Sequence, residues 1–204
     1  SSDVCSSDLV LPQKTRTALD SKNGYNSPEV LSAYLWSHFG DLLNETRATD
    51  AYKVWSSSLP SSTGDALDVG CAVGRLSFEL AKKNERVIGV DTSVSFIRKA
   101  REILGRKRLD FELIVEGFLT EPRRFDFEES WNFEAVDFIV ADALALPFRT
   151  HSFATVAAIN LVDKVPNPVK HLEEVNRVLH REASVFLFSD PFSWDPGVSP
   201  PERW

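Results

Sequence analysis

The chain has 204 residues, of which 43% are hydrophobic and 26% are charged, a composition typical of one globular domain with a buried core. Its formal net charge of −7 argues against a nucleic-acid partner, because binding to phosphates depends on a basic surface. No apolar run reaches the length of a membrane-spanning helix. The two cysteines, Cys5 and Cys71, lack metal-ligand spacing and form no disulfide framework, so we expect no metal site and a reducing, cytoplasmic setting.

Residues 1–24 show neither helix nor strand periodicity, and the triplet Ser-Ser-Asp occurs twice among the first eight. We expect this segment to be a disordered or non-native leader. The first helix signal is Ser27-Pro28-Glu29, which combines an N-cap serine, a proline at the first helical position and an acid in the first turn. This helix is expected to end at Gly40, and a second amphipathic helix is expected over 48–57.

From residue 66 onward, short apolar runs alternate with amphipathic segments, a pattern that predicts a mostly parallel sheet covered by helices on both faces. The expected strands are 66–69, 87–90, 136–140, 155–159 and 184–188, and the expected helices are 75–83, 94–104 and 169–179.

The segment 109–131 interrupts this alternation. We expect a short strand over 111–115, turns at Glu116-Gly117 and Glu121-Pro122, and an acidic loop over 126–129. Because insertions at the carboxyl edge of a parallel sheet commonly build substrate pockets, we expect this one to do so.

The loop after the first strand contains Gly70 and Gly74, with Ala72 between them. A dinucleotide-binding loop needs a third glycine in the pattern G-x-G-x-x-G, and large residues occupy the positions that could supply it. Asp91 ends the next strand, where a carboxylate can accept hydrogen bonds from both hydroxyls of a ribose. The spacing therefore favours an adenosine-containing ligand other than a dinucleotide.

This pattern resembles the first motif of class I S-adenosylmethionine-dependent methyltransferases, which implies a Rossmann-like α/β fold with S-adenosylmethionine as cofactor. The resemblance implies that Gly70, Ala72 and Gly74 approach the methionine part and that Asp68 holds its ammonium. Arg75 is expected either to pair with the carboxylate of the cofactor or to point to solvent. The implied cofactor contacts are Asp68, Gly70, Ala72, Gly74, Arg75, Asp91, Thr92, Asp142, Ala143 and Asn160.

A closer resemblance extends over about 24–204. It is carried by the helix 25–40, the loop 70–75, the segment 160–166 and the tail motifs 190–194 and 201–204. The chain resembles the C-terminal domain of ovothiol-biosynthesis enzymes, which N-methylates the imidazole of a 5-thiohistidine.

Two departures from that family lie in the last fifth of the chain. A tyrosine expected near Phe192 is missing, and His180 to Ala183 replace a Pro-Gly-Gly turn. In that family the domain usually follows an iron-dependent sulfoxide synthase, which implies an upstream domain or partner. The class I fold usually ends in an antiparallel strand pair, and the proline-rich tail predicts that this hairpin is lacking.

The resulting expectation is a single methyltransferase domain over 25–204, with lid helices at 25–60, a cofactor-binding core at 61–190 and a truncated tail at 191–204. The expected positioning residues are Asn160, Asp163 and Tyr25, and the expected substrate-binding residues are Tyr25, Tyr34, Asp163, Phe192 and Trp194. An exposed loop acid is an equally open reading of Asp163. Methylation of another small-molecule N, O or C acceptor remains an alternative, as does a catalytically silent cofactor-binding module.

Overall fold

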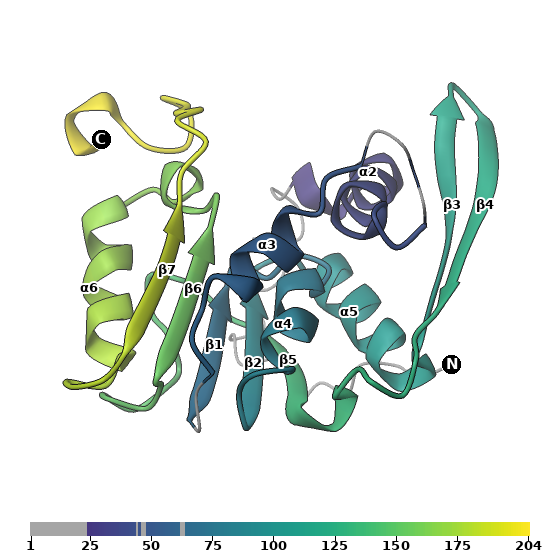
Figure 1. Cartoon of the computed structure of the whole chain (residues 1–204). Coiled ribbons are helices and arrows are strands. Elements are labelled where there is room, and N and C mark those ends of the chain that lie inside the picture. The colour runs from purple at the N-terminus through teal and green to yellow at the C-terminus, as the bar shows by residue number, and fades with distance from the viewer. Residues whose placement is uncertain (1–23, 44, 46–47, 62–63) are drawn as a thin grey trace.

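The computed structural model describes residues 24–43, 45, 48–61 and 64–204, so almost all of the expected leader lies outside the described residues. Five parallel strands form the central sheet in the order β5-β2-β1-β6-β7 (Figure 1). They are β1 (Asp65–Val69), β2 (Arg86–Asp91), β5 (Val136–Val140), β6 (Thr155–Ile159) and β7 (Val185–Ser189). The predicted parallel sheet is confirmed, and each expected strand lies within two residues of its observed bounds.

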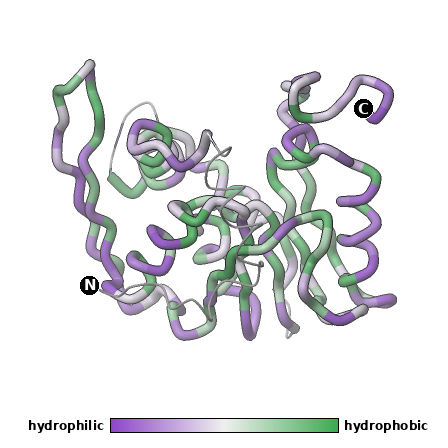
Figure 2. Tube along the Cα trace, turned by 180° about the vertical axis from the view of Figure 1, so that it is seen from behind, coloured by the Kyte–Doolittle hydropathy of each residue, from purple (hydrophilic) through white to green (hydrophobic). Residues whose placement is uncertain are grey.

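Two apolar clusters show how helices cover both faces of the sheet. On one face, α4 (Arg75–Leu80) and α5 (Val94–Arg106) pack against alternate residues of β1, β2 and β5. On the other face, α6 (Pro168–Val178) packs on the remaining strand residues. Figure 2 shows the resulting pattern, with hydrophobic central strands and a hydrophilic outer side of α6. The strands are apolar almost throughout because both of their faces are buried.

Side-chain caps begin the helices where the sequence signals them. Ser27 accepts a hydrogen bond from the amide of Val30 at the start of α2 (Pro28–Phe39). Ser93 caps α5 and Asn167 caps α6 in the same way. Two expected helices are shorter than predicted: α3 spans Ala51–Ser57, and α4 gives way to turns after Leu80.

The insertion before β5 differs from its prediction. It forms a long antiparallel hairpin of β3 (Arg108–Glu116) and β4 (Leu119–Asp126) outside the main sheet (Figure 1). The expected turn at Glu121-Pro122 is wrong, because both residues pair with β3. Proline is tolerated there because β4 is an edge strand. The hairpin packs against α2, with the Ser32 hydroxyl donating to the Glu112 carbonyl at 3.0 Å.

The chain after β7 lies above the upper ends of β7 and α6 and ends in a 3-10 turn, η5 (Pro201–Arg203) (Figure 1). Among the described residues, no strand follows β7. Figure 1 shows β7 without a further strand along its outer side.

Candidate active site

A cavity of about 700 Å³ opens where the parallel strands end. The carboxyl ends of β1, β2, β5 and β6 form its floor, through Val69, Asp91, Ala141 and Ile159. This edge is where open α/β sheets bind ligands, because the connections diverge there and leave a crevice. Residues of η2 (Gly24–Asn26), α2 and α3 form the opposite wall. The hairpin β3–β4 contributes no lining residue, so the expectation that the insertion builds the pocket is wrong.

Gly70 brings the backbone to the cavity surface. Its φ of +75° lies in the left-handed region, and an added Cβ would lie only 3.0 Å from Leu161 Cδ1. The amides of Gly70 and Cys71 both donate to the Val90 carbonyl, which fixes the loop across the end of β2. Ala72 also has a positive φ, of 47°. Gly70 and Ala72 line the cavity as the sequence predicts.

Gly74 has a different place. An added Cβ would lie 2.5 Å from Cζ of Phe138, a fully buried side chain of β5, and the φ of Gly74 is +86°. Gly74 is not among the residues that line the cavity. Position 74 therefore requires a glycine because α4 packs closely on the sheet there and because the backbone is left-handed, and not because a ligand approaches it.

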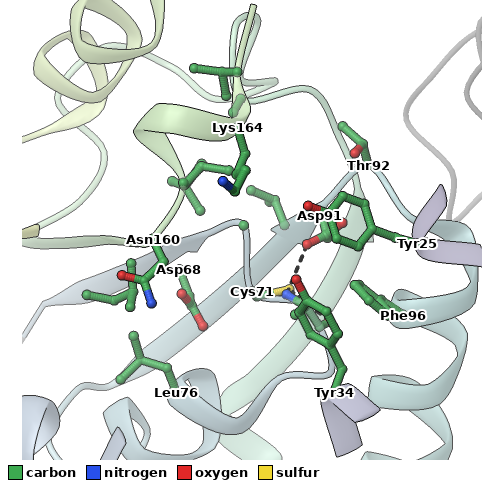
Figure 3. A pocket seen from close by; sticks show the side chains of 18 of the residues that line it. Tyr25, Tyr34, Asp68, Cys71, Leu76, Asp91, Thr92, Phe96, Asn160 and Lys164 are labelled. Atoms are coloured by element: carbon green, nitrogen blue, oxygen red, sulfur yellow. Dashed lines mark hydrogen bonds between the residues drawn. The ribbon is translucent and has the colours of Figure 1, made fainter. Parts of the chain in front are cut away.

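Asp91 is held at the end of β2 by backbone amides. Its Oδ2 accepts from Ala72 at 3.0 Å, and its Oδ1 accepts from Ser93 at 2.8 Å. Burial raises the pKa of Asp91, while these amide hydrogen bonds oppose the rise. The remaining lone pairs leave a fixed acceptor at the cavity wall, next to Thr92, Tyr25 and Phe96 (Figure 3).

Asp142, Ala143 and Asn160 also lie where the sequence predicts, on the loops after β5 and β6. Asp142 Oδ1 accepts from the Leu144 amide at 2.8 Å, which fixes the loop after β5. Asn160 has a φ of 54°, and its Oδ1 accepts from the Ser189 hydroxyl at 2.7 Å. Figure 3 shows Asn160 beside Asp68, across the cavity from Asp91 and Tyr25.

Asp68 is a buried carboxylate in the cavity wall, only 2% exposed. Its Oδ2 accepts from the Ser77 hydroxyl at 2.6 Å. Burial raises the pKa of Asp68 to about 7, against the opposing hydrogen bond from Ser77, and the charge of Asp91 adds to the rise. Among the described residues no cationic side chain pairs with Asp68, so its position favours a positively charged ligand, which would stabilise the ionised form of the carboxylate.

Arg75 does not reach the cavity, and both of its expected roles are wrong. Its guanidinium is 1% exposed and forms ion pairs with Asp41 at 2.8 Å and Glu79 at 2.6 Å. Its Nε donates to the His38 carbonyl at 3.2 Å. Arg75 therefore ties the end of α2 to α4, because a buried cation needs such partners to offset its lost hydration.

Three expected substrate residues also lie outside the cavity lining. Asp163 is fully buried, and its Oδ2 accepts from Lys164 Nζ at 2.8 Å and from the Ser193 hydroxyl at 2.9 Å. Burial alone would raise the pKa of Asp163, but these hydrogen bonds bring it below its usual range. Phe192 is 81% exposed, and Trp194 stacks on Trp204 with ring centroids 5.8 Å apart. Asp163 thus fastens the tail, and no substrate role follows from its position.

A row of six rings, called the ring wall below, lines the side of the cavity formed by η2, α2, α3 and the start of α5. Neighbouring ring centroids lie 4.5 to 5.8 Å apart along the row, which consists of Tyr25, Phe96, Tyr34, His38, Tyr52 and Trp55. Of these six residues, only Tyr25 and Tyr34 are predicted from the sequence as site residues. The helical pattern indicates only that α2 buries a face, and the position of α3 against α2 has no local signal.

His38 and Tyr52 are directly hydrogen-bonded, with Nε2 and Oη 2.7 Å apart. Burial, with the nearby charge of Arg75, lowers the pKa of His38 to about 3. Burial also raises the pKa of Tyr52 far above its ordinary value, and the charge of Asp68 adds to the rise. Both side chains are therefore neutral at physiological pH.

Within the described ranges, no group of three or more His, Cys, Asp or Glu side chains has the arrangement of a metal site. A search of the same residues finds no helix with the length and apolar character needed to span a bilayer.

Comparison with known proteins adds a family match. A family model described as "Methyltransferase domain" matches residues 67–187, which is more than half of the chain. The chain is 26% identical over 149 residues to the ubiquinone/menaquinone biosynthesis C-methyltransferase UbiE of Rickettsia prowazekii. That alignment covers 68% of this chain and 51% of the relative, so the chain spans about half the length of the curated relatives it matches.

Solved structures share the fold. The YcgJ protein from Bacillus subtilis has a TM-score of 0.53 and 19% identity, covering 69% of this chain and 50% of its own. Phosphoethanolamine N-methyltransferase 2 of Haemonchus contortus, solved in complex with S-adenosyl-L-methionine, has a TM-score of 0.57 and 18% identity. That match covers 81% of this chain and 33% of the other.

Proposed function

Because the chain belongs to the methyltransferase domain family and is an S-adenosylmethionine-dependent methyltransferase, we propose that it methylates a small planar acceptor, the imidazole nitrogen of a 5-thiohistidine. The observation that carries the acceptor class is the row of six rings along one wall of the cavity. Flat, uncharged side chains favour a flat ring over an extended or strongly charged chain. The motifs shared with ovothiol-type enzymes support the thiohistidine itself.

The cavity fits the cofactor in size and in charge. Its volume of about 700 Å³ lies within the usual range of small-molecule sites. S-adenosylmethionine supplies an electrophilic methyl group on a sulfonium and also carries an ammonium. We assign Asp91 to the ribose hydroxyls, Asp68 to the ammonium end and the loop Asp142–Ala143 to the adenine. These acidic side chains are distributed along the cavity, so that each can face a hydrogen-bond donor or a positive charge of a cationic nucleoside.

The proposed chemistry requires little from the protein beyond orientation. A neutral imidazole has a pKa near 6.5 and is already nucleophilic at pH 7. Methyl transfer is a displacement in which nucleophile, carbon and leaving group must be collinear, so positioning contributes most of the rate. The ring wall holds the acceptor, and Asn160 lines the cavity just after the carboxyl end of β6.

A different acceptor is suggested by the curated relatives, which are named for carbon methylation in quinone biosynthesis. A phenol or quinol carbon becomes strongly nucleophilic only when its hydroxyl loses a proton. The cavity offers one carboxylate whose pKa is raised to about 7, that of Asp68. This second candidate therefore uses Asp68 as a base in place of its assignment to the ammonium, and predicts that Asp68→Asn abolishes turnover of a quinol while leaving binding of the quinol and of S-adenosylmethionine intact.

Incubation of the purified chain with S-adenosylmethionine and 5-thiohistidine tests the proposal. Mass spectrometry is expected to detect the gain of one methyl group, and NMR is expected to place it on a ring nitrogen. Asp91→Ala serves as the matched control, because loss of charge-assisted hydrogen bonds is expected to weaken cofactor binding at least tenfold. Methylation of a demethylated quinol but not of 5-thiohistidine under saturating cofactor would refute the proposed acceptor.

A further inference from the structure

His38 and Tyr52 form a directly hydrogen-bonded pair within the ring wall. They come from different helices, α2 and α3, and both line the cavity. Their hydrogen bond of 2.7 Å joins the two helices. His38 is 8% exposed, and its second ring nitrogen, Nδ1, is buried with no hydrogen-bond partner among the residues that the structure describes. The pair therefore has an unusual feature, a buried polar atom without a partner beside a ligand cavity.

The missing partner at Nδ1 decides the direction of the hydrogen bond. A neutral imidazole carries one N–H and one lone pair. If Tyr52 donated to Nε2, the hydrogen would sit on Nδ1 and leave a buried N–H unpaired, an arrangement that folded proteins rarely contain. If Nε2–H donates to Tyr52 Oη instead, only a lone pair is left at Nδ1. The second arrangement costs less, so Nε2 is the donor.

This direction leaves the hydroxyl hydrogen of Tyr52 free to point elsewhere. Tyr52 lines the cavity, so the hydrogen can be offered to a ligand there. We propose that Tyr52, oriented by His38, donates a hydrogen bond to the methyl acceptor at an anionic or lone-pair atom other than the attacking nitrogen. In a mercapto-imidazole, that atom is the sulfur. This inference rests on the proposed function and names the group that makes the site prefer a thiolated ring.

The substrate preference tests this role. In Tyr52→Phe the ring contacts with His38 and Trp55 can remain, at centroid distances of 4.5 and 5.3 Å in the parent, and only the hydroxyl is lost. Loss of a hydrogen bond to a charged group is expected to weaken binding of the acceptor about tenfold. We expect KM for 5-thiohistidine to rise about tenfold while KM for S-adenosylmethionine stays unchanged, and the preference over L-histidine to fall by the same factor.

Two further variants separate positioning from loss of structure. His38→Phe is expected to reproduce the loss in Tyr52→Phe, and His38→Gln, which keeps a donor, is expected to restore part of it. Ser57→Ala is the control on α3, since its hydroxyl is exposed and, within the described part of the chain, donates only to the Val54 carbonyl. An unchanged preference for the thiolated ring in Tyr52→Phe would overturn the proposal.

A spectroscopic measurement is independent of turnover. In protein labelled with nitrogen-15 at histidine, His38 is expected to be neutral and protonated at Nε2 at pH 7, and its Nε2 signal is expected to shift in Tyr52→Phe. A neutral ring protonated at Nδ1 would overturn the inference even if 5-thiohistidine is methylated. If 5-thiohistidine is not methylated, the proposal that it is the acceptor is wrong. The tautomer of His38 then still supports or overturns the role of Tyr52 as a hydrogen-bond donor.

Discussion

At the scale of single residues, Asp68 shows how a ligand site can reduce the stability of the fold that contains it. Its side chain is buried, no cation within the described ranges pairs with it, and burial raises its pKa from 3.8 to about 7. A carboxyl whose pKa is higher in the folded state binds its proton more tightly there than in the unfolded chain. The unfolding free energy therefore falls as pH rises from about 4 to about 7, and above pH 7 the full loss is present.

Asp68→Asn is expected to remove this loss. The asparagine can still accept from Ser77 but carries no charge, so the variant should be more stable than the parent at pH 8 by a few kcal/mol and only slightly so at pH 4. Thermal unfolding at both pH values measures the difference, which corresponds to several degrees in Tm at pH 8. Asp50→Asn, at an exposed position without a side-chain cap bond, is the control. An equal difference at both pH values would contradict the assignment.

At the scale of elements, the hairpin β3–β4 supports the cavity without lining it. Ser32 on α2 donates to the Glu112 carbonyl at 3.0 Å and accepts from the Ile114 amide at 3.1 Å. The same helix carries Tyr34 and His38 into the ring wall. Since α2 lies between hairpin and cavity, its position is set from both sides.

Ser32→Ala is expected to break both hydrogen bonds and leave two backbone groups of β3 without this partner. We expect a loss of about 1–3 kcal/mol in urea unfolding, and a higher KM for the acceptor with little change in KM for S-adenosylmethionine. Ser58→Ala, an exposed hydroxyl after α3, provides the comparison. If both variants have the same stability and the same acceptor KM, the hairpin does not position α2.

The elements differ in how much of their position the sequence encodes. The strands and their helices are predicted to within a few residues because apolar runs and caps such as Ser93 and Asn167 act locally. The loop after β1 is also predicted from a local signal, its small residues between a strand and a helix. The ring wall is not, because it depends on how α2 and α3 meet. The expected roles of Arg75 are wrong because Glu79 is its neighbour one turn along α4, and Asp41, which is distant in the sequence, meets it only in the folded chain.

At the scale of the whole molecule, the cavity brings together segments that lie far apart in the sequence. Its lining includes Tyr25, Tyr52, Asp91, Asp142 and Asn160, which come from five separate elements or loops. A ligand that contacts all of these segments is expected to stabilise them together, since a ligand that binds only the folded state shifts the equilibrium away from unfolding. Local motifs predict the sheet half of this site, whereas the opposite half arises only from tertiary packing.

Binding of S-adenosylhomocysteine is therefore expected to protect distant segments at once. At a concentration about 100 times Kd, the unfolding free energy should rise by about 2.7 kcal/mol. Hydrogen exchange should slow in the loop 70–72, at the end of β2, and in α2 and α3, because these elements enclose the cavity. The hairpin tip, where Phe118 is fully exposed, provides an internal control and should exchange at an unchanged rate. Protection confined to the loop 70–72 would mean that α2 and α3 do not close over the bound cofactor, and equal protection at the hairpin tip would mean that the effect is global rather than specific to the cavity wall.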